Sequence, residues 1–93
     1  MSFEFEWDSQ KALANRLKHE VDFEEACTVF KDPWSVTISD EGHSQGEERF
    51  LILGTSDAGR LLVVAHTERG ERIRIISARA ATRGERRDYE RRS

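Results

Sequence analysis

Three runs of strand-forming residues that follow one another in the second half of the chain constrain the fold most. They span residues 49–55, 60–67 and 71–79, are rich in aliphatic and β-branched residues, and are separated by short polar turns. Such runs are typical of strands, and connections this short join antiparallel neighbours. The sequence therefore predicts a meander of three antiparallel strands.

The first part of the chain adds a strand and a helix. Residues 3–7 alternate between aromatic residues and glutamates, which is the period-2 pattern of a strand with one buried face. Asp8 stands where it can cap a helix over residues 9–19. Leu13 and Leu17 lie one turn apart in that helix, so the pattern predicts that they face the core.

A second helix is predicted between Asp22 and the Asp-Pro pair at residues 32–33. Glu25 follows Asp22 by three residues, which is the spacing of a capping box. The helix ends at the Asp-Pro pair, because the residue before a proline disfavours helical geometry. Residues 34–39 form a further predicted strand, and the polar residues 40–48 an exposed loop.

A third helix over residues 83–92 begins with the same capping-box spacing, formed by Thr82 and Glu85. The predicted order is strand, helix, helix, four strands, helix. In 93 residues this order predicts one α+β domain over residues 1–93, with two N-terminal helices on one face of a mostly antiparallel sheet and a C-terminal helix. The other face of the sheet is left to solvent or a ligand.

Charge is distributed unevenly along the chain. The formal net charge is −3, but residues 1–67 carry a net −7 and residues 68–93 a net +4, and every cation of the second segment is an arginine. The planar guanidinium group binds phosphate or carboxylate through two parallel hydrogen bonds. The basic end therefore suits RNA phosphates or an acidic protein partner, although a solvated charged face gives the same counts.

Composition also argues against several classes of protein. The one cysteine, Cys27, cannot form an internal disulfide and lies in an apolar stretch, so we expect a buried thiol and a cytoplasmic protein. No segment is apolar enough for a membrane span. The three histidines, His19, His43 and His66, lack metal-ligand spacing, and there is no phosphate-binding glycine loop, so we expect no metal or cofactor.

The predicted hairpins bring cationic residues together on one face of the sheet. A three-residue loop over residues 68–70 places His66 opposite Arg72. A four-residue loop in the preceding hairpin places Arg49 on the other side of His66, and Arg74 lies one position along the same face. We therefore expect a row of Arg49, His66 and Arg72, with Arg74 beside it, on the face away from the first two helices.

Such a row has the residue types that RNA cleavage without a metal ion requires. His66 can take or give a proton near neutral pH, and arginines can stabilise the charge of a pentacoordinate phosphorane. Lys18 and Tyr89 are further candidates for orienting the substrate or donating a proton. Arg79 is a candidate only if the chain bulges after Ser77, because plain alternation places it with the core residues.

Each candidate also has a purely structural interpretation. A strand histidine between arginines is commonly a surface residue, and a tyrosine on a terminal helix commonly packs against its neighbours. A lysine near the end of a helix can complement the helix dipole. Residue type alone does not separate these interpretations from catalysis.

Short motifs occur over nearly the whole chain in a characteristic order and spacing. They are Phe5-Glu6-Trp7-Asp8, Asn15, Lys18-His19, Phe23-Glu24-Glu25-Ala26, Asp32-Pro33, Glu48-Arg49-Phe50, Thr67-Glu68-Arg69, Arg72 to Arg79, and Glu85-Arg86 with Tyr89-Glu90. In order and spacing this series resembles the BrnT family of toxins. One departure is Glu20, which follows the Lys-His pair where the family usually has a glycine.

The resemblance implies a RelE-like fold, ribonuclease activity against cellular RNA, growth arrest, and neutralisation by a BrnA-type antitoxin whose complex binds operator DNA. Together with the predicted row of cations, it leads us to expect a metal-independent endoribonuclease that inhibits translation. The alternative is a non-catalytic module that binds RNA or an acidic peptide through the arginine-rich end. An inactive toxin kept for its partner contact is a third interpretation.

Overall fold

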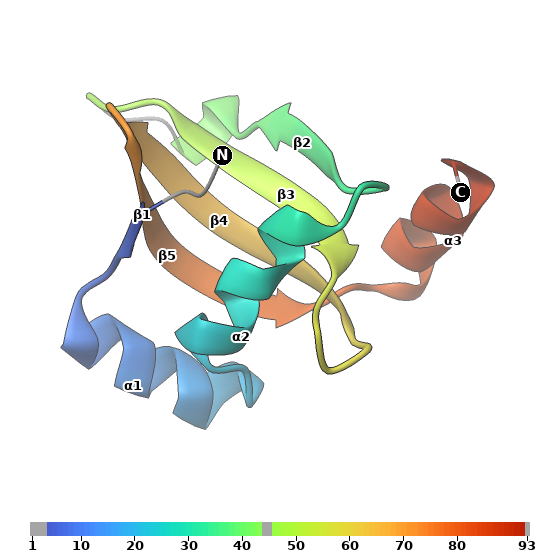
Figure 1. Ribbon diagram of the computed structural model, residues 1–93, viewed down its shortest axis with the longest axis horizontal. Coiled ribbons are helices and arrows are strands. Elements are labelled where there is room, and N and C mark those ends of the chain that lie inside the picture. Colours follow the sequence, from blue (N-terminus) through green and yellow to red (C-terminus); the bar gives the residue numbers. More distant parts are fainter. Residues whose placement is uncertain (1–3, 44–45, 93) are drawn as a thin grey trace.

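A five-stranded sheet lies at the centre of the computed structural model, which describes residues 4–43 and 46–92 (Figure 1). The strands are β1 (Glu4–Glu6), β2 (Val36–Ser39), β3 (Arg49–Thr55), β4 (Leu61–Arg69) and β5 (Arg72–Ala80), in the spatial order β1-β5-β4-β3-β2. The predicted meander of β3, β4 and β5 is confirmed, with β2 antiparallel at one edge and β1 parallel to β5 at the other. Phe3 and residues 44–45, which belong to the predicted first strand and loop, lie outside the described residues.

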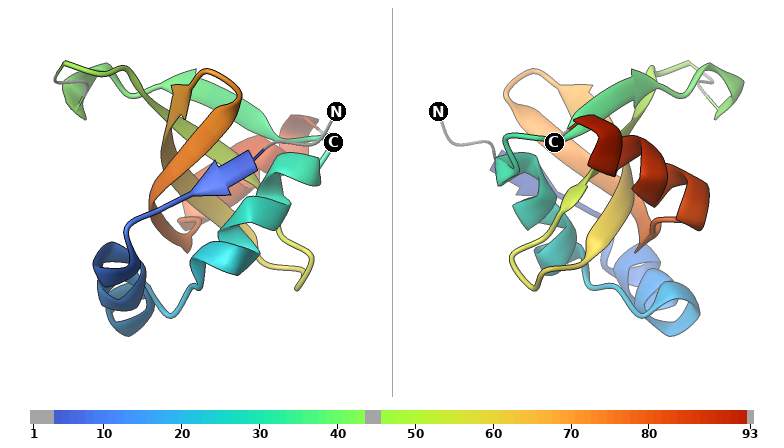
Figure 2. Two further views of the ribbon diagram at one scale, coloured as in Figure 1. Left: turned by 60° about the vertical axis from the view of Figure 1, so that its left-hand side comes forward. Right: turned by 90° about the vertical axis from the view of Figure 1, so that its right-hand side faces the viewer.

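Helices cover both faces of the sheet. They are α1 (Ser9–His19), α2 (Phe23–Thr28), the 3-10 turns η1 (Val29–Lys31) and η2 (Glu41–His43), and α3 (Arg83–Arg92). Figure 2 shows α2 and α3 on opposite sides of the sheet. The core lies between the sheet and α2 with η1, and its buried members are Val21, Phe23, Ala26, Val29, Ile52, Leu62, Val64, Ile73, Ile75 and Ala78. We call the opposite face of the sheet, on which α3 lies, the open face.

Both predicted hairpin registers are wrong. Strand β4 ends at Arg69 and β5 begins at Arg72, so a two-residue turn replaces the predicted three-residue loop. His66 therefore lies opposite Ile75 instead of Arg72. The loop of the preceding hairpin is also longer than predicted, so Phe50 pairs with His66 in place of Arg49. Because side chains alternate between the faces of a sheet, an odd change of register moves a residue to the other face. His66 therefore belongs to the core face.

A bulge in β5 restores the apolar pattern beyond the hairpin. His66 pairs with Ile75 but its neighbour Ala65 pairs with Ser77, so Ile76 is the extra residue. The bulge keeps Ile75 and Ala78 in the core. It also places Arg79 opposite Val63 on the open face, although the bulge lies at Ile76 and not after Ser77, where the sequence analysis required it.

Helix α1 presents a different face to the sheet from the one predicted. Leu13 and Leu17 are 58% and 77% exposed, so their predicted burial is wrong. Asn15 is buried instead: its amide nitrogen donates to the carbonyl oxygens of Val21 (3.0 Å) and Ala78 (2.9 Å), and its amide oxygen accepts from the backbone nitrogen of Ala78 (3.0 Å). Within the described part of the chain, β1 pairs with β5 at residues 72–74 and no further along β5. Asn15 thus satisfies the edge of β5 beyond β1, a requirement that apolar side chains cannot meet.

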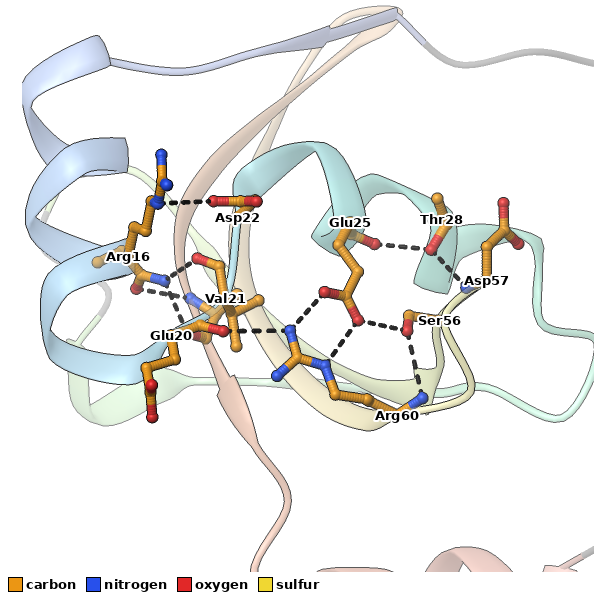
Figure 3. Close-up of polar contacts among 11 residues, drawn as sticks. Arg16, Glu20, Val21, Asp22, Glu25, Thr28, Ser56, Asp57 and Arg60 are labelled. Carbon is orange, nitrogen blue, oxygen red and sulfur yellow. Dashed lines mark hydrogen bonds and ion pairs between the residues drawn. The ribbon is translucent and has the colours of Figure 1, made fainter.

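Contacts at the end of α1 fix its position (Figure 3). Arg60 follows the β3–β4 turn, donates to the backbone carbonyl of Glu20 (3.2 Å), and forms a two-point ion pair with Glu25 on α2. Ser56 also donates to Glu25 (2.6 Å). Arg60 lowers the pKa of the Glu25 carboxyl group below its usual range. Glu20 itself has φ 59° and ψ 36°, the left-handed geometry that glycine adopts most easily.

The helix caps are partly as predicted. Asp8 accepts from the backbone nitrogens of Gln10 and Lys11 and caps α1. Thr82 and Glu85 form the predicted capping box, with backbone-to-side-chain hydrogen bonds of 2.8 and 3.2 Å. The predicted box at the start of α2 is wrong, because Glu25 faces Arg60 and Ser56 instead of the helix end.

Candidate functional site

The structure removes His66 from the predicted row. His66 is 1% exposed on the core face, with its ring centroid 4.9 Å from that of Phe30 and 5.8 Å from that of Phe50. Burial lowers the pKa of its imidazole below the ordinary value, which favours the neutral ring. Arg49 points to the opposite face, so the predicted contact of Arg49, His66 and Arg72 is wrong.

A different row crosses the open face at the same level of the sheet. Register pairs join Glu6 to Arg74, Arg74 to Thr67, and Thr67 to Arg49, so one residue from each of β1, β5, β4 and β3 lies side by side. We call these four residues the cross-sheet row. Neighbouring strands are about 4.8 Å apart, so the two arginines flank Thr67 at a distance that suits one phosphate group.

Thr67 is the unusual member of the cross-sheet row. It is 4% exposed, and its hydroxyl oxygen is buried without a hydrogen-bond partner in the described part of the chain. Buried hydroxyl groups are nearly always hydrogen-bonded, because an unsatisfied one costs about 1–3 kcal/mol. The row therefore holds an unsatisfied hydroxyl group between the register positions of two arginines.

The cross-sheet row opens into a pocket of about 300 Å³ that we call the arginine pocket. Its lining residues are Lys11, Glu47, Arg49, Thr67, Arg69, Arg74 and Ile76. Four of the seven are cations. Arg69 forms a two-point ion pair with Glu47 (2.8 and 3.1 Å), and Arg74 donates one hydrogen bond to Glu6 (3.0 Å). A guanidinium group has five N–H donors, so these contacts leave donors for a ligand.

A second pocket of about 240 Å³ continues along α1, and we call it the helix pocket. Its lining residues are Lys11, Ala14, Asn15, Lys18, His19, Ile76 and Ser77, so it shares Lys11 and Ile76 with the arginine pocket. Lys11, Ala14 and Lys18 recur every three or four residues and therefore lie on one face of α1. The two lysines are about 10 Å apart along the helix. The two pockets form one basic groove, and Lys18, a predicted site residue, lies in it.

Arg72 lies at the edge of this groove. It forms ion pairs with Glu4 (3.6 Å) and Glu6 (3.4 Å), and most of its side chain is exposed. It does not line either pocket. The structure thus brings Arg49, Arg74 and Lys18 together and leaves Arg72 at the rim.

Arg79 and Tyr89 hold α3 on the open face. Arg79 donates two hydrogen bonds to Glu85 (2.8 and 2.9 Å), and this contact lowers the pKa of Glu85 to about 2. The Tyr89 hydroxyl group donates to Asp32 and accepts from Thr55 (3.2 Å). Both predicted site residues therefore connect α3 to the sheet, and neither lines the basic groove.

A third pocket beside α3 has a different character. It is lined mainly by the aliphatic residues Val36, Ile38, Leu51, Leu53 and Val63, together with Glu85, Asp88, Tyr89 and Arg92. An apolar lining does not bind phosphate. Among the described residues, no three His, Cys, Asp or Glu side chains gather in a way that could hold a metal ion.

Sequence reasoning missed several residues of the basic groove. Thr67 and Arg69 enter it only in the observed register. Glu6 lies beside the groove, hydrogen-bonded to Arg74, because β1 pairs with β5, and no pattern in the sequence indicated that pairing. The spacing of Lys11 and Lys18 by seven residues was an available signal, because it places both lysines on one helix face.

A family model described as a ribonuclease toxin, BrnT, of type II toxin-antitoxin systems matches residues 7–85, which include every residue of the basic groove. The chain belongs to the BrnT family. Membership makes it a ribonuclease toxin of a type II toxin-antitoxin system, with RNA as its substrate class and an antitoxin as its partner. A comparison with curated proteins finds no match.

Among solved structures, the chain is similar to the BrnT ribonuclease toxin of Brucella abortus, determined at 1.1 Å resolution. The TM-score is 0.67, the sequence identity is 19%, and the match covers 88% of this chain and 100% of the other. At this identity the likeness concerns the fold, and it confirms the predicted α+β class. None of the described helices is long and apolar enough to cross a membrane.

Proposed function

We propose that this BrnT toxin cleaves RNA in the basic groove without a metal ion and thereby stops translation and growth. One observation carries the proposal: Lys11, Lys18, Arg49, Arg69 and Arg74 line two connected pockets around a buried hydroxyl group that has no partner in the described chain. Fixed cations can stabilise a phosphorane as a metal ion does, because they lie where the charge develops.

In this proposal the arginine pocket binds the scissile phosphate and the helix pocket binds neighbouring phosphates. Arg49 and Arg74 hold the scissile phosphate over Thr67, while Lys11 and Lys18 contact further phosphates of the same strand along α1. Arg72 adds positive charge at the rim. Arg79 and Tyr89 position α3 and do not touch the substrate.

The test uses purified protein freed from its partner, a labelled RNA and excess chelator at fixed salt. We expect cleavage that persists with chelator. Arg49→Ala and Arg74→Ala each slow it by roughly 10²- to 10³-fold, the usual cost of losing a group that stabilises the transition state. Arg16→Ala is the matched control, because Arg16 lies on α1 outside both pockets.

Salt dependence gives an independent measure of phosphate contacts. For single strands, the logarithm of affinity falls with the logarithm of salt concentration by about 0.7 for each phosphate neutralised. We expect Lys18→Ala to reduce this slope by about that amount. Cleavage that stops with chelator would contradict metal independence. RNA binding without any cleavage would favour the alternative of a non-catalytic binding module.

The antitoxin that we propose is of the BrnA type, as the sequence resemblance implies, and its complex rather than the toxin alone binds operator DNA. An acidic segment of such a partner would complement the arginines of the groove and of α3. Exposed charge pairs weaken as salt rises, so we expect the complex to be salt-sensitive. A complex that is indifferent to salt and leaves the groove open to RNA would contradict this mechanism of neutralisation.

A further inference from the structure

We propose that Glu6 is the general base that removes the proton from the RNA 2′-hydroxyl group, at a scissile phosphate seated on the cross-sheet row. This inference rests on the proposed ribonuclease function and names the residue that starts the reaction. It also defines the substrate as RNA with a free 2′-hydroxyl group.

The reaction needs a proton acceptor in the groove or beside it. Lysine and arginine side chains are protonated at neutral pH, and His66 lies on the other side of the sheet. Asp8 is near Lys11 and Arg74, but its carboxylate caps α1. We therefore compare Glu47 and His19, which line the pockets, with Glu6, which lies beside them against Arg74. Position relative to Arg74 and Thr67 separates them.

Glu6 is the acceptor that belongs to the cross-sheet row itself. Its Oε2 accepts from Arg74 at 3.0 Å and lies 3.8 Å from Arg69, and its Oε1 accepts from Arg72 at 3.4 Å. The Glu6 side chain is 24% exposed, so a substrate can reach it. Arg74 can hold Glu6 through one N–H group and a phosphate through others. A 2′-hydroxyl group next to that phosphate then lies beside the Glu6 carboxylate.

The other two acceptors lie outside the cross-sheet row. Glu47 lines the arginine pocket, but it is held by two hydrogen bonds from Arg69 and has no register pair in the row. His19 lines the helix pocket, eight residues and so about 12 Å along α1 from Lys11. Its position suits contact with a neighbouring nucleotide.

The proposed step balances without an added reagent. The O2′–H bond breaks, its proton passes to a Glu6 carboxylate oxygen, and O2′ attacks phosphorus to form the new P–O2′ bond. The P–O5′ bond breaks, and the leaving 5′-oxygen takes a proton from the ammonium group of Lys11. The products are a 2′,3′-cyclic phosphate and a 5′-hydroxyl end. Arg49 and Arg74 bind the non-bridging oxygens throughout.

The decisive variant is Glu6→Gln, which keeps the size of the side chain and an oxygen for Arg74 but cannot take the proton. We expect cleavage to slow by roughly 10²- to 10⁴-fold. Affinity for an RNA oligonucleotide with 2′-O-methyl groups at every position should stay equal or rise, because a negative charge beside the phosphate is lost. Glu71→Gln is the matched control, because Glu71 is exposed in the turn between β4 and β5 and lines neither pocket, and it should cleave at a rate within a few-fold of the wild-type rate.

The pH profile of kcat/KM separates Glu6 from His19, because it reports the free enzyme. The groups that face Glu6 are Arg69, Arg72 and Arg74, and hydrogen bonds from Arg74 and Arg72 hold the pKa of Glu6 below its ordinary 4.5. A Glu6 base therefore predicts no loss of rate between pH 8 and 5, with the acid limb below 4.5. A histidine base predicts a limb near pH 6.5.

The outcomes distinguish this inference from the proposed function. Wild-type protein that does not cleave RNA would refute the function itself. Wild-type cleavage that Glu6→Gln leaves intact, or an acid limb near pH 6.5 that His19→Gln abolishes, would overturn the role of Glu6. If Glu6→Gln does not fold, Glu6→Asp takes its place: we expect it to slow cleavage at least 10-fold and to keep the pH profile, and a wild-type rate would overturn the inference.

Discussion

Asn15 gives the sharpest test of how the chain builds the wall of its groove. Three hydrogen bonds join its amide to Val21 and Ala78, and they fix α1, which carries Lys11 and Lys18, against the end of β5. Asn15→Leu has similar volume but makes none of these bonds. It leaves one buried N–H group and two carbonyl groups without these partners.

The loss of stability comes from the buried N–H and carbonyl groups that lose their hydrogen-bond partner. Each buried polar group without a partner costs about 1–3 kcal/mol, and carbonyl groups with a second contact fall at the low end. Burying an apolar side chain returns about 1–2 kcal/mol. The net loss is about 2–4 kcal/mol of the free energy of unfolding. For a domain of this size it corresponds to a fall in Tm of roughly 10–20 °C.

Thermal unfolding followed by circular dichroism measures this effect, and Leu17→Asn is the reciprocal control. Leu17 is exposed, so placing an amide there should change stability by about 0.5 kcal/mol or less. The sequence pattern alone predicts the reverse order, with Leu17 costly and Asn15 neutral. An Asn15→Leu variant within 3 °C of wild type, beside a Leu17→Asn variant that loses more than 10 °C, would refute the placement of α1.

Three further predictions concern single sites. Glu20→Gly should raise the free energy of unfolding by about 0.5–1 kcal/mol in denaturant titrations, because it relieves left-handed geometry and keeps the carbonyl that Arg60 binds; a loss of stability would contradict this. His66→Leu should keep wild-type RNA cleavage and comparable stability, since His66 fills the core, and a 100-fold loss of activity in a folded variant would return it to the site. The folded pKa of Glu85, about 2, lies below its unfolded value, so the stability that its ion pair contributes is complete above about pH 4.5 and is lost as pH falls toward 2. Arg79→Ala should remove about 1–2 kcal/mol of that pH dependence after solvent screening. An Arg79→Ala variant whose Tm depends on pH between 6 and 2 as the wild type's does would contradict this.

Hydrophobic periodicity predicted the elements well and their registers poorly. The strands of the meander, the Asp8 cap and the Thr82 capping box are local, and local patterns indicate them. The register of β4 and β5 depends on two long-range facts: the hairpin turns in two residues, and Ile76 bulges. Neither has a local signal, so His66 and Arg49 were placed on one face when they lie on opposite faces.

The site shows the same division between local and long-range information. Arg49, Arg74 and Lys18 were predicted, because residue type and an approximate location suffice for them. Thr67 and Glu6 were missed, since their place depends on the observed register and on the parallel pairing of β1 with β5. Unsatisfied hydrogen bonding, which singles out Thr67, is visible only in the folded chain.

The most direct test of the central claim is to locate bound RNA on the protein. Isotope-labelled protein is titrated with the uncleavable 2′-O-methyl oligonucleotide, and backbone amide shifts are followed by NMR at low salt. The account predicts the largest shifts at Lys11, Thr67, Arg74 and Ile76, which line the arginine pocket. Shifts confined to α2 and η1, or to the apolar pocket beside α3, with none at those four residues, would contradict it.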